Sequence, residues 1–241
     1  DETRQTPARR EVAALSSRTL KVHAWFNADA KHAPLVIYSH GFGGNRDDLT
    51  YATELLAARG AVVVALDFPS TNTYAKGGPW LDDVVNQPGD VRFVVDQLLA
   101  FNRDAQHPLF GRIDEARIGA MGLSLGGMTT QLLVFDPLRR DERIRAAVSI
   151  AGLRSMLTPS FYAARGVPFL EIGATDDNVV RFADNAARVP RDIPGSRLVA
   201  LSHGTHAAFA GVFRYLRFIA RPDDIACRFI NRESSKTEIG Y

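Results

Sequence analysis

Residues 117–135 predict a strand, a very tight turn and a helix in immediate succession. Residues 117–121 form an apolar run, the turn reads Gly122-Leu123-Ser124-Leu125-Gly126, and residues 128–135 suit a helix. So tight a turn strains the backbone of its serine, and the flanking positions have no room for a Cβ atom. The strain lifts the Ser124 hydroxyl above the sheet edge, where the following helix points its positive end. The segment therefore indicates a nucleophilic serine.

The rest of the chain alternates strands with helices. An alternating pattern at residues 19–26 predicts an edge strand, and further strands are expected at residues 34–39, 61–68, 144–150, 167–172 and 197–201. Helices are expected at residues 46–59, 89–102, 182–188 and 206–220, whereas residues 69–88 have no periodicity and are expected to form a loop. This order predicts an α/β fold with a mostly parallel central sheet and helices on both faces. We expect an N-terminal arm (1–18), a single domain (19–221) and a polar tail (222–241).

The composition excludes several classes of protein. The 241 residues are 46% hydrophobic and 23% charged, and their net charge of +2 is too small to indicate a nucleic acid or an anionic membrane as partner. No apolar run is long enough to span a membrane. The single cysteine, Cys227, allows no intramolecular disulfide, and no His/Asp cluster has ligand spacing. We therefore expect no metal and no cofactor.

The cellular compartment and the oligomeric state stay open at this level. The sequence begins at Asp1 rather than at methionine. A secreted or periplasmic protein is expected if a signal peptide has been removed, and a cytoplasmic one otherwise.

The turn around Ser124, between a strand and a helix, resembles the nucleophile elbow of α/β-hydrolases. A serine hydroxyl needs a general base, and the base needs an acid to orient it. In that fold the acid follows a later strand and the histidine follows the last one. Here Asp176 and Asp177 follow the strand at 167–172, and His203 and His206 follow the strand at 197–201. We favour Asp177, which precedes an apolar segment, and His206, which follows a Gly-Thr pair, with Asp176 and His203 as the alternatives.

Two backbone N–H groups are expected to form an oxyanion hole. One belongs to Leu125, directly after the serine, and the other to Phe42, in the glycine-rich loop after the strand at 34–39. The predicted cleft is open, because the segment between the strands at 144–150 and 167–172 is too short for a large lid domain. Its expected walls, and therefore the candidate substrate-binding residues, are the aromatic side chains of Phe42, Tyr74, Trp80 and Phe161.

Several motifs together resemble those of known hydrolases. They are Ser39-His40-Gly41-Phe42-Gly43-Gly44, Gln87-Pro88-Gly89-Asp90, Ile113-Asp114 and the serine turn, and they resemble bacterial α/β-hydrolases labelled predicted dienelactone hydrolases and the plasma-type platelet-activating-factor acetylhydrolases. Residues 173–180 and Gly204-Thr205-His206 are similar to those of cutinase-type polyester hydrolases. The cutinase resemblance places the catalytic acid at Asp177, the histidine at His206, and the oxyanion donors at Phe42 and Leu125.

These observations predict a serine hydrolase that cleaves carboxylic esters, small or polymeric, through an acyl-enzyme. A cutinase-type polyester hydrolase and an acyltransferase with the same three residues remain as alternatives. A non-catalytic binding domain is disfavoured, because such domains typically lose the serine or the histidine, and this chain has both.

Overall fold

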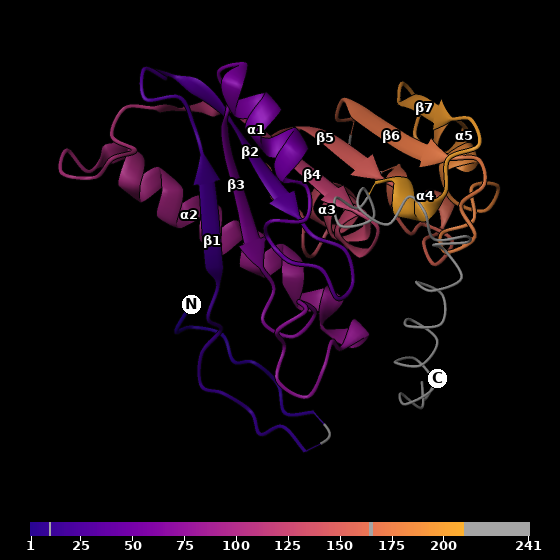
Figure 1. The fold of residues 1–241 in the computed structure, drawn as a ribbon, viewed down its shortest axis with the longest axis horizontal. Helices are drawn as coiled ribbons and strands as arrows, with labels where there is room; N and C mark the ends of the chain where they lie inside the picture. The colour runs from indigo at the N-terminus through magenta and orange to yellow at the C-terminus, as the bar shows by residue number, and fades with distance from the viewer. Residues whose placement is uncertain (10, 164–165, 210–241) are drawn as a thin grey trace.

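The computed structural model describes residues 1–9, 11–163 and 166–209, which build one seven-stranded sheet flanked by helices (Figure 1). The strands are β1 (Lys21–Trp25), β2 (Ala33–Ser39), β3 (Val62–Asp67), β4 (Ile113–Leu123), β5 (Ile144–Ile150), β6 (Phe169–Ala174) and β7 (Arg197–Leu201). Their order in the sheet is β1-β3-β2-β4-β5-β6-β7. Only β1, at one edge, runs antiparallel to its neighbour. The predicted mostly parallel sheet with an edge strand at its start is confirmed.

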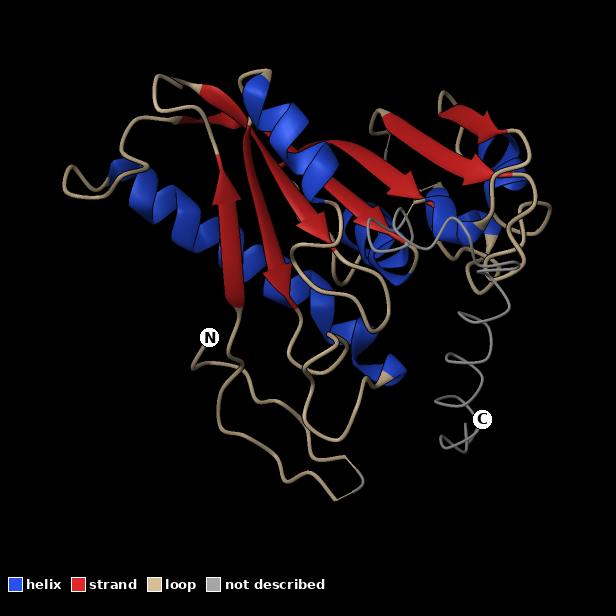
Figure 2. Ribbon diagram, in the orientation of Figure 1, coloured by secondary structure: helices blue, strands red, loops and turns tan. Residues whose placement is uncertain are grey.

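Helices cover both faces of this sheet (Figure 2). The longer ones are α1 (Thr50–Ala58), α2 (Gln87–Arg103) and α3 (Leu125–Phe135). Strand β3 shows how the faces are separated: Val62, Val64 and Leu66 pack with α2 and α3, whereas Val63 and Ala65 lie in the clusters on the side of α1. All six residues of β3 are buried, as expected of a strand enclosed by two helical layers.

The shorter elements depart from the predicted pattern in several places. The helix expected at residues 182–188 is replaced by turns, the 3₁₀ turn η2 (Ala186–Arg188) and the four-residue helix α5 (Val189–Asp192). The backbone of Asn185 is not helical there (φ −120°, ψ −89°), and its Oδ1 accepts the N–H groups of Arg154 and Ser155. The expected loop at 69–88 contains a 3₁₀ helix, η1 (Leu81–Asn86), which leads directly into α2. Helix α1 begins at Thr50, after turns at its predicted start. Of the helix expected at residues 206–220, the described part holds the 3₁₀ turn η3 (His206–Ala208), and residues 210–220 lie outside the described residues.

The segment between β5 and β6, where a lid could be inserted, contains only the four-residue helix α4 (Pro159–Tyr162) in its described part. None of the helices in the described ranges combines the length and the apolar character that a membrane crossing requires.

The N-terminal residues form a hairpin below the sheet in Figure 1, beside the loop that joins β3 to α2. Antiparallel bridges join Thr6 to Leu15 and Arg9 to Val12. The guanidinium group of Arg9 donates hydrogen bonds to the backbone carbonyls of Lys76 and Gly78, and Arg18 lies almost fully buried against η1 and α2. The N-terminal arm, residues 1–18, is thus attached to the loop after β3 and to the start of α2.

Candidate active site

Ser124 occupies the sharp turn between β4 and α3, with φ 54° and ψ −114°. A Cβ atom on Gly122 would lie 2.0 Å from the carbonyl oxygen of Gly126, and one on Gly126 would lie 2.0 Å from that of Ser39. The two glycines are therefore required by close approach of the backbone. The N–H of Ser124 donates to the carbonyl of Ile150 at 2.8 Å, which holds the strained residue at the carboxyl end of the sheet.

The loop that follows β2 lies against this turn. A Cβ atom on Gly41 would contact that of Ser124 at 3.4 Å. Beneath the loop, the ring of His40 is fully buried: its Nε2 accepts the N–H of Phe68 at 3.1 Å, and its Nδ1 lies 2.7 Å from the carbonyl of Gly41. Burial lowers the pKa of His40 to about 4, so the imidazole is neutral at ordinary pH. A neutral ring that bridges two backbone groups braces the loop that carries Phe42.

Asp177 and His206 form a hydrogen-bonded pair at the same end of the sheet. The Nδ1 of His206 lies 2.7 Å from Oδ2 of Asp177, and the side chain of Asp177 is 1% exposed. The other carboxylate oxygen, Oδ1, accepts the N–H groups of Val179 at 2.9 Å and Val180 at 2.7 Å. Both oxygens of Asp177 are therefore fixed, and one of them orients the histidine ring.

The alternative residues, Asp176 and His203, also lie together, but on the surface. The Nδ1 of His203 is 3.5 Å from Oδ2 of Asp176, and the two side chains are 92% and 51% exposed. A backbone hydrogen bond from Asp176 to the carbonyl of Gly204, 2.9 Å long, joins the two loops. Neighbouring residues of each loop thus form one buried pair and one solvent-exposed pair.

An apolar cluster lines the region next to the serine turn. Its buried members are Val84, Leu125, Met128 and Leu132, and Phe42, Leu81, Leu153, Leu157 and Phe161 pack against them. The structure therefore brings together Phe42 and Phe161 of the four expected wall residues. Tyr74 is 73% exposed, and Trp80 is partly buried with its Nε1 donating to Asp82; neither belongs to an apolar cluster of the described residues.

Sequence reasoning missed an ionisable group inside the sheet. Glu171 of β6 is fully buried, and its Oε1 accepts the N–H of Gly152 at 3.2 Å. Burial raises the pKa of Glu171 to about 8. The signal was present, because Glu171 interrupts an otherwise apolar strand, and an isolated acid within such a run is rarely solvated.

Gly152 links Glu171 to the serine turn. A Cβ atom on Gly127, at the start of α3, would lie only 2.6 Å from the Cα of Gly152. The buried carboxyl group of Glu171 thus lies behind the first turn of α3.

The described residues contain no group of three or more His, Cys, Asp or Glu side chains placed to hold a metal ion. What they do contain is a strained serine, an oriented imidazole and a glycine-rich loop at the carboxyl ends of parallel strands. This combination suits acyl transfer, in which a serine attacks a carbonyl carbon.

The chain is similar to two known proteins. "Cutinase est1" of Thermobifida alba is 28% identical over 176 residues, which are 72% of this chain. "Putative esterase NocK" of Nocardia uniformis subsp. tsuyamanensis is 28% identical over 193 residues, or 78% of this chain. The matched regions make up 53% of each relative, so the chain spans about half the length of these proteins.

The model of one protein family, described as PET hydrolase-like, matches residues 18–209. This match covers the whole sheet, from β1 to β7, and includes the serine turn and the loops of Asp177 and His206. It confirms the expected α/β-hydrolase fold and the resemblance to cutinase-type hydrolases. The chain belongs to the PET hydrolase-like family of α/β-hydrolases.

Proposed function

We propose that this protein is a serine hydrolase that cleaves carboxylic esters through an acyl-enzyme intermediate. Ser124 is the nucleophile, His206 the general base and Asp177 the residue that orients the imidazole. The observation that carries the proposal is the buried Asp177–His206 pair, 2.7 Å long, on the same sheet end as a serine at φ 54°. Membership in a family described as PET hydrolase-like supports the same reaction class.

In the first half of the reaction, Nε2 of His206 takes the proton of the Ser124 hydroxyl while the oxygen attacks the ester carbonyl. The negative charge that develops on the carbonyl oxygen is stabilised by the backbone N–H groups of Phe42 and Leu125. The intermediate then collapses, the C–O bond to the alcohol breaks, and His206 returns the proton to the leaving oxygen.

In the second half, water replaces the alcohol. His206 removes a proton from the water as it attacks the acyl carbon, and the carboxylic acid leaves Ser124 with its proton restored. The apolar cluster around Phe42, Leu153 and Phe161 lies beside the serine turn and provides a surface for the acyl or alcohol portion. The side chains of this cluster are all apolar, which favours an uncharged acyl or alcohol portion.

A polyester is the second candidate substrate. The family description and the similarity to a cutinase favour it. The segment between β5 and β6 also favours it, because the described part of this segment contains a single four-residue helix. A long chain requires an open groove rather than an enclosed pocket, and a short segment at this position leaves room for one.

Turnover of p-nitrophenyl butyrate by the wild-type protein and by Ser124→Ala tests the reaction class. We expect Ser124→Ala to lose at least about a thousandfold in kcat with its fold intact. The control is Ser202→Ala, which removes the hydroxyl of an exposed serine directly after β7 and should keep full activity. A fluorophosphonate adduct located by mass spectrometry should lie on Ser124, and an adduct elsewhere would contradict the mechanism. Release of soluble products from a polyester film then separates polymer from small-ester activity.

A further inference from the structure

Gln87, the first residue of α2, is a fully buried amide that joins two other segments of the chain. Its Nε2 donates to the hydroxyl of Thr71 at 2.8 Å, and its Oε1 accepts a hydrogen bond from the hydroxyl of Thr129. Thr71 belongs to the loop after β3, and Thr129 belongs to the early part of α3. Both ends of the Gln87 amide are therefore engaged, each with a different segment.

One of these segments holds the loop of Phe42. The backbone carbonyl of Thr71 accepts the N–H of Gly43 at 2.8 Å, and the N–H of Thr73 donates to the carbonyl of Gly44 at 2.8 Å. Two backbone hydrogen bonds thus tie the loop after β3 to the residues that directly follow Phe42. A displacement of Thr71 would move this loop with it.

The other segment holds Leu125. The hydroxyl of Thr129 lies 3.2 Å from the carbonyl oxygen of Leu125, one turn earlier in α3, as well as contacting Gln87. Leu125 and Phe42 provide the two backbone N–H groups of the proposed oxyanion hole. Gln87 is thus connected through one hydroxyl to each half of that hole.

We propose that Gln87 is a positioning residue that sets the spacing between the two N–H donors, Phe42 and Leu125. This inference rests on the proposed function. Oxyanion donors work only when they lie about 2.7–3.1 Å from the charged oxygen, and a shift of about 1 Å in an active site can cost a hundredfold in rate. Gln87 does not contact the reacting atoms, so it acts through Thr71 and Thr129.

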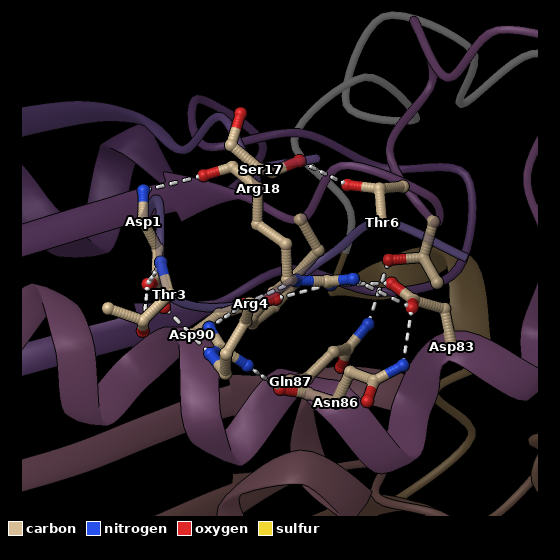
Figure 3. Close-up of polar contacts among 12 residues, drawn as sticks. Asp1, Thr3, Arg4, Thr6, Ser17, Arg18, Asp83, Asn86, Gln87 and Asp90 are labelled. Atoms are coloured by element: carbon tan, nitrogen blue, oxygen red, sulfur yellow. Dashed lines mark hydrogen bonds and ion pairs between the residues drawn. The ribbon is translucent and has the colours of Figure 1, made fainter. Parts of the chain in front are cut away.

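The N-terminal arm holds Gln87 in place. Asp83 of η1 and Asp90 of α2 lie on either side of it in the sequence, and the guanidinium group of Arg18 contacts both carboxylates (Figure 3). The distances from Arg18 are 2.8 Å to Asp83 and 2.7 Å to Asp90, and all three side chains are at most 1% exposed. Arg4 adds a second contact to Asp90. The turn that carries Gln87 is therefore anchored on both sides.

The test is a comparison of Gln87→Leu with the wild type, using a chromogenic short-chain ester. Leucine keeps the approximate volume and removes both hydrogen bonds. We expect kcat to fall about tenfold to a hundredfold while KM stays within about twofold, because the ground state does not use the oxyanion hole fully. The affinity for a trifluoromethyl ketone, which forms an oxyanion on the serine, should fall by a similar factor. The variants Thr71→Val and Thr129→Val, which each cut one end, should shift both quantities in the same direction by less.

Asn102 offers a matched control at the other end of the same helix. Its amide accepts the N–H of Ile113 at 2.8 Å, and it donates to the carbonyl of Ile113 at 3.0 Å and to Oε1 of Glu115 at 3.3 Å, far along α2 from the serine turn. Asn102→Leu should lower the melting temperature and leave kcat and the ketone affinity unchanged. An equal loss of kcat in Asn102→Leu and Gln87→Leu would show general destabilisation and overturn the proposal.

The remaining outcomes separate this inference from the proposed function. An active wild type with unchanged kcat and ketone affinity in Gln87→Leu overturns the role of Gln87 alone. A wild type that hydrolyses no ester and forms no adduct at Ser124 overturns the proposed function, and the positioning role with it. If Gln87→Leu does not fold, Thr71→Val and Thr129→Val test the proposal instead. A lower kcat in these variants supports the role of Gln87, and a wild-type kcat in both contradicts it.

Discussion

At the scale of single residues, Asp176 and Asp177 show how strongly burial separates two neighbouring carboxylates. Asp177 is fixed by two backbone N–H groups and by His206, whereas Asp176 contacts the largely exposed His203. A general base must keep one orientation through the reaction, and a ring that is 92% exposed has no such constraint. The pairing favours His206 as the base.

The histidines can be compared directly. His206→Ala should lower kcat/KM for a soluble ester by at least about a thousandfold, because the serine then lacks a general base. His203→Ala should stay within about twofold of the wild type. Initial rates of p-nitrophenyl ester hydrolysis measure both, with circular dichroism to confirm that each variant is folded. A larger loss in His203→Ala than in His206→Ala would contradict the assignment.

Local sterics explain which parts of the site could be predicted from the sequence. The serine turn follows from Gly122 and Gly126, since a side chain at either position would meet backbone atoms within the motif or at the end of β2. The sequence favours Asp177 and His206 through their neighbours, but the hydrogen bond between the two side chains joins loops 29 residues apart and is seen only in the structure. Gln87 and Glu171 contact distant segments of the chain, and no local pattern records those partners, although Glu171 stands out as an acid within an apolar strand.

At the scale of elements, the N-terminal arm is held to the body by a buried charge cluster. Burial lowers the pKa of Arg18, but hydrogen bonds to Asp90 and Asp83 outweigh it, so the pKa lies above the ordinary arginine value. The guanidinium group remains charged, and together with Arg4, which contacts Asp90, it places two cations against the two buried carboxylates. The arm is therefore coupled electrostatically to η1 and α2.

Loss of this charge should be costly. Arg18→Met removes the buried cation that Asp83 and Asp90 share and leaves Asp90 with Arg4, and we expect the free energy of unfolding to fall by about 3–5 kcal/mol. Urea denaturation measures the change. The control is Arg103→Met, which breaks an ion pair with Glu115 whose arginine is 68% exposed, and it should cost less than about 1 kcal/mol. Equal effects in the two variants would show that the buried cluster contributes no more than a surface pair.

The arm and the loop after β3 were also the elements least accessible to sequence reasoning. Residues 69–88 lack periodicity, yet η1 forms there, because Asp83 is held by Arg18 from a distant part of the chain. The helix expected at 182–188 is interrupted by a contact with a distant segment as well, since the side chain of Asn185 binds the backbone N–H groups of Arg154 and Ser155. Tertiary contacts decide such short elements.

At the scale of the whole molecule, Glu171 makes global stability depend on pH. Its pKa is about 8 in the folded protein, against an ordinary value of 4.5. Between these values the folded state retains a proton that the unfolded state has released, so the free energy of unfolding decreases as pH rises. The contribution of neutral Glu171 is complete below about pH 4.5 and is lost as pH passes through about 8.

Glu171→Gln removes this titration while keeping the shape of the side chain. Between pH 5 and pH 8, the free energy of unfolding of the variant relative to that of the wild type should rise by about 1.4 kcal/mol per pH unit. Urea denaturation at three or four pH values gives the difference curve. A flat difference, with the variant equally stable relative to wild type at every pH, would show that Glu171 does not titrate as its burial requires.

The general architecture was accessible from the sequence because it depends on repeated patterns. Continuous apolar runs such as β3 predict strands enclosed on both faces, and a helix between two of them implies a parallel pair. The prediction of a sheet between two layers of helices therefore did not depend on any individual side-chain contact. By contrast, the attachment of the arm depends on the individual side chains of Arg4, Arg9 and Arg18.

The Arg18 cluster also orders events during synthesis. The arginine is separated from Asp83 by 65 residues and from Asp90 by 72, so it leaves the ribosome long before either partner. The arm cannot dock until the start of α2 has emerged. Closing so long a loop carries an entropic cost that slows docking. Docking of the arm thus becomes possible once α2 has begun to emerge, before β4 to β7 are synthesised, and a nascent chain acquires the anchored Gln87 turn no earlier than this.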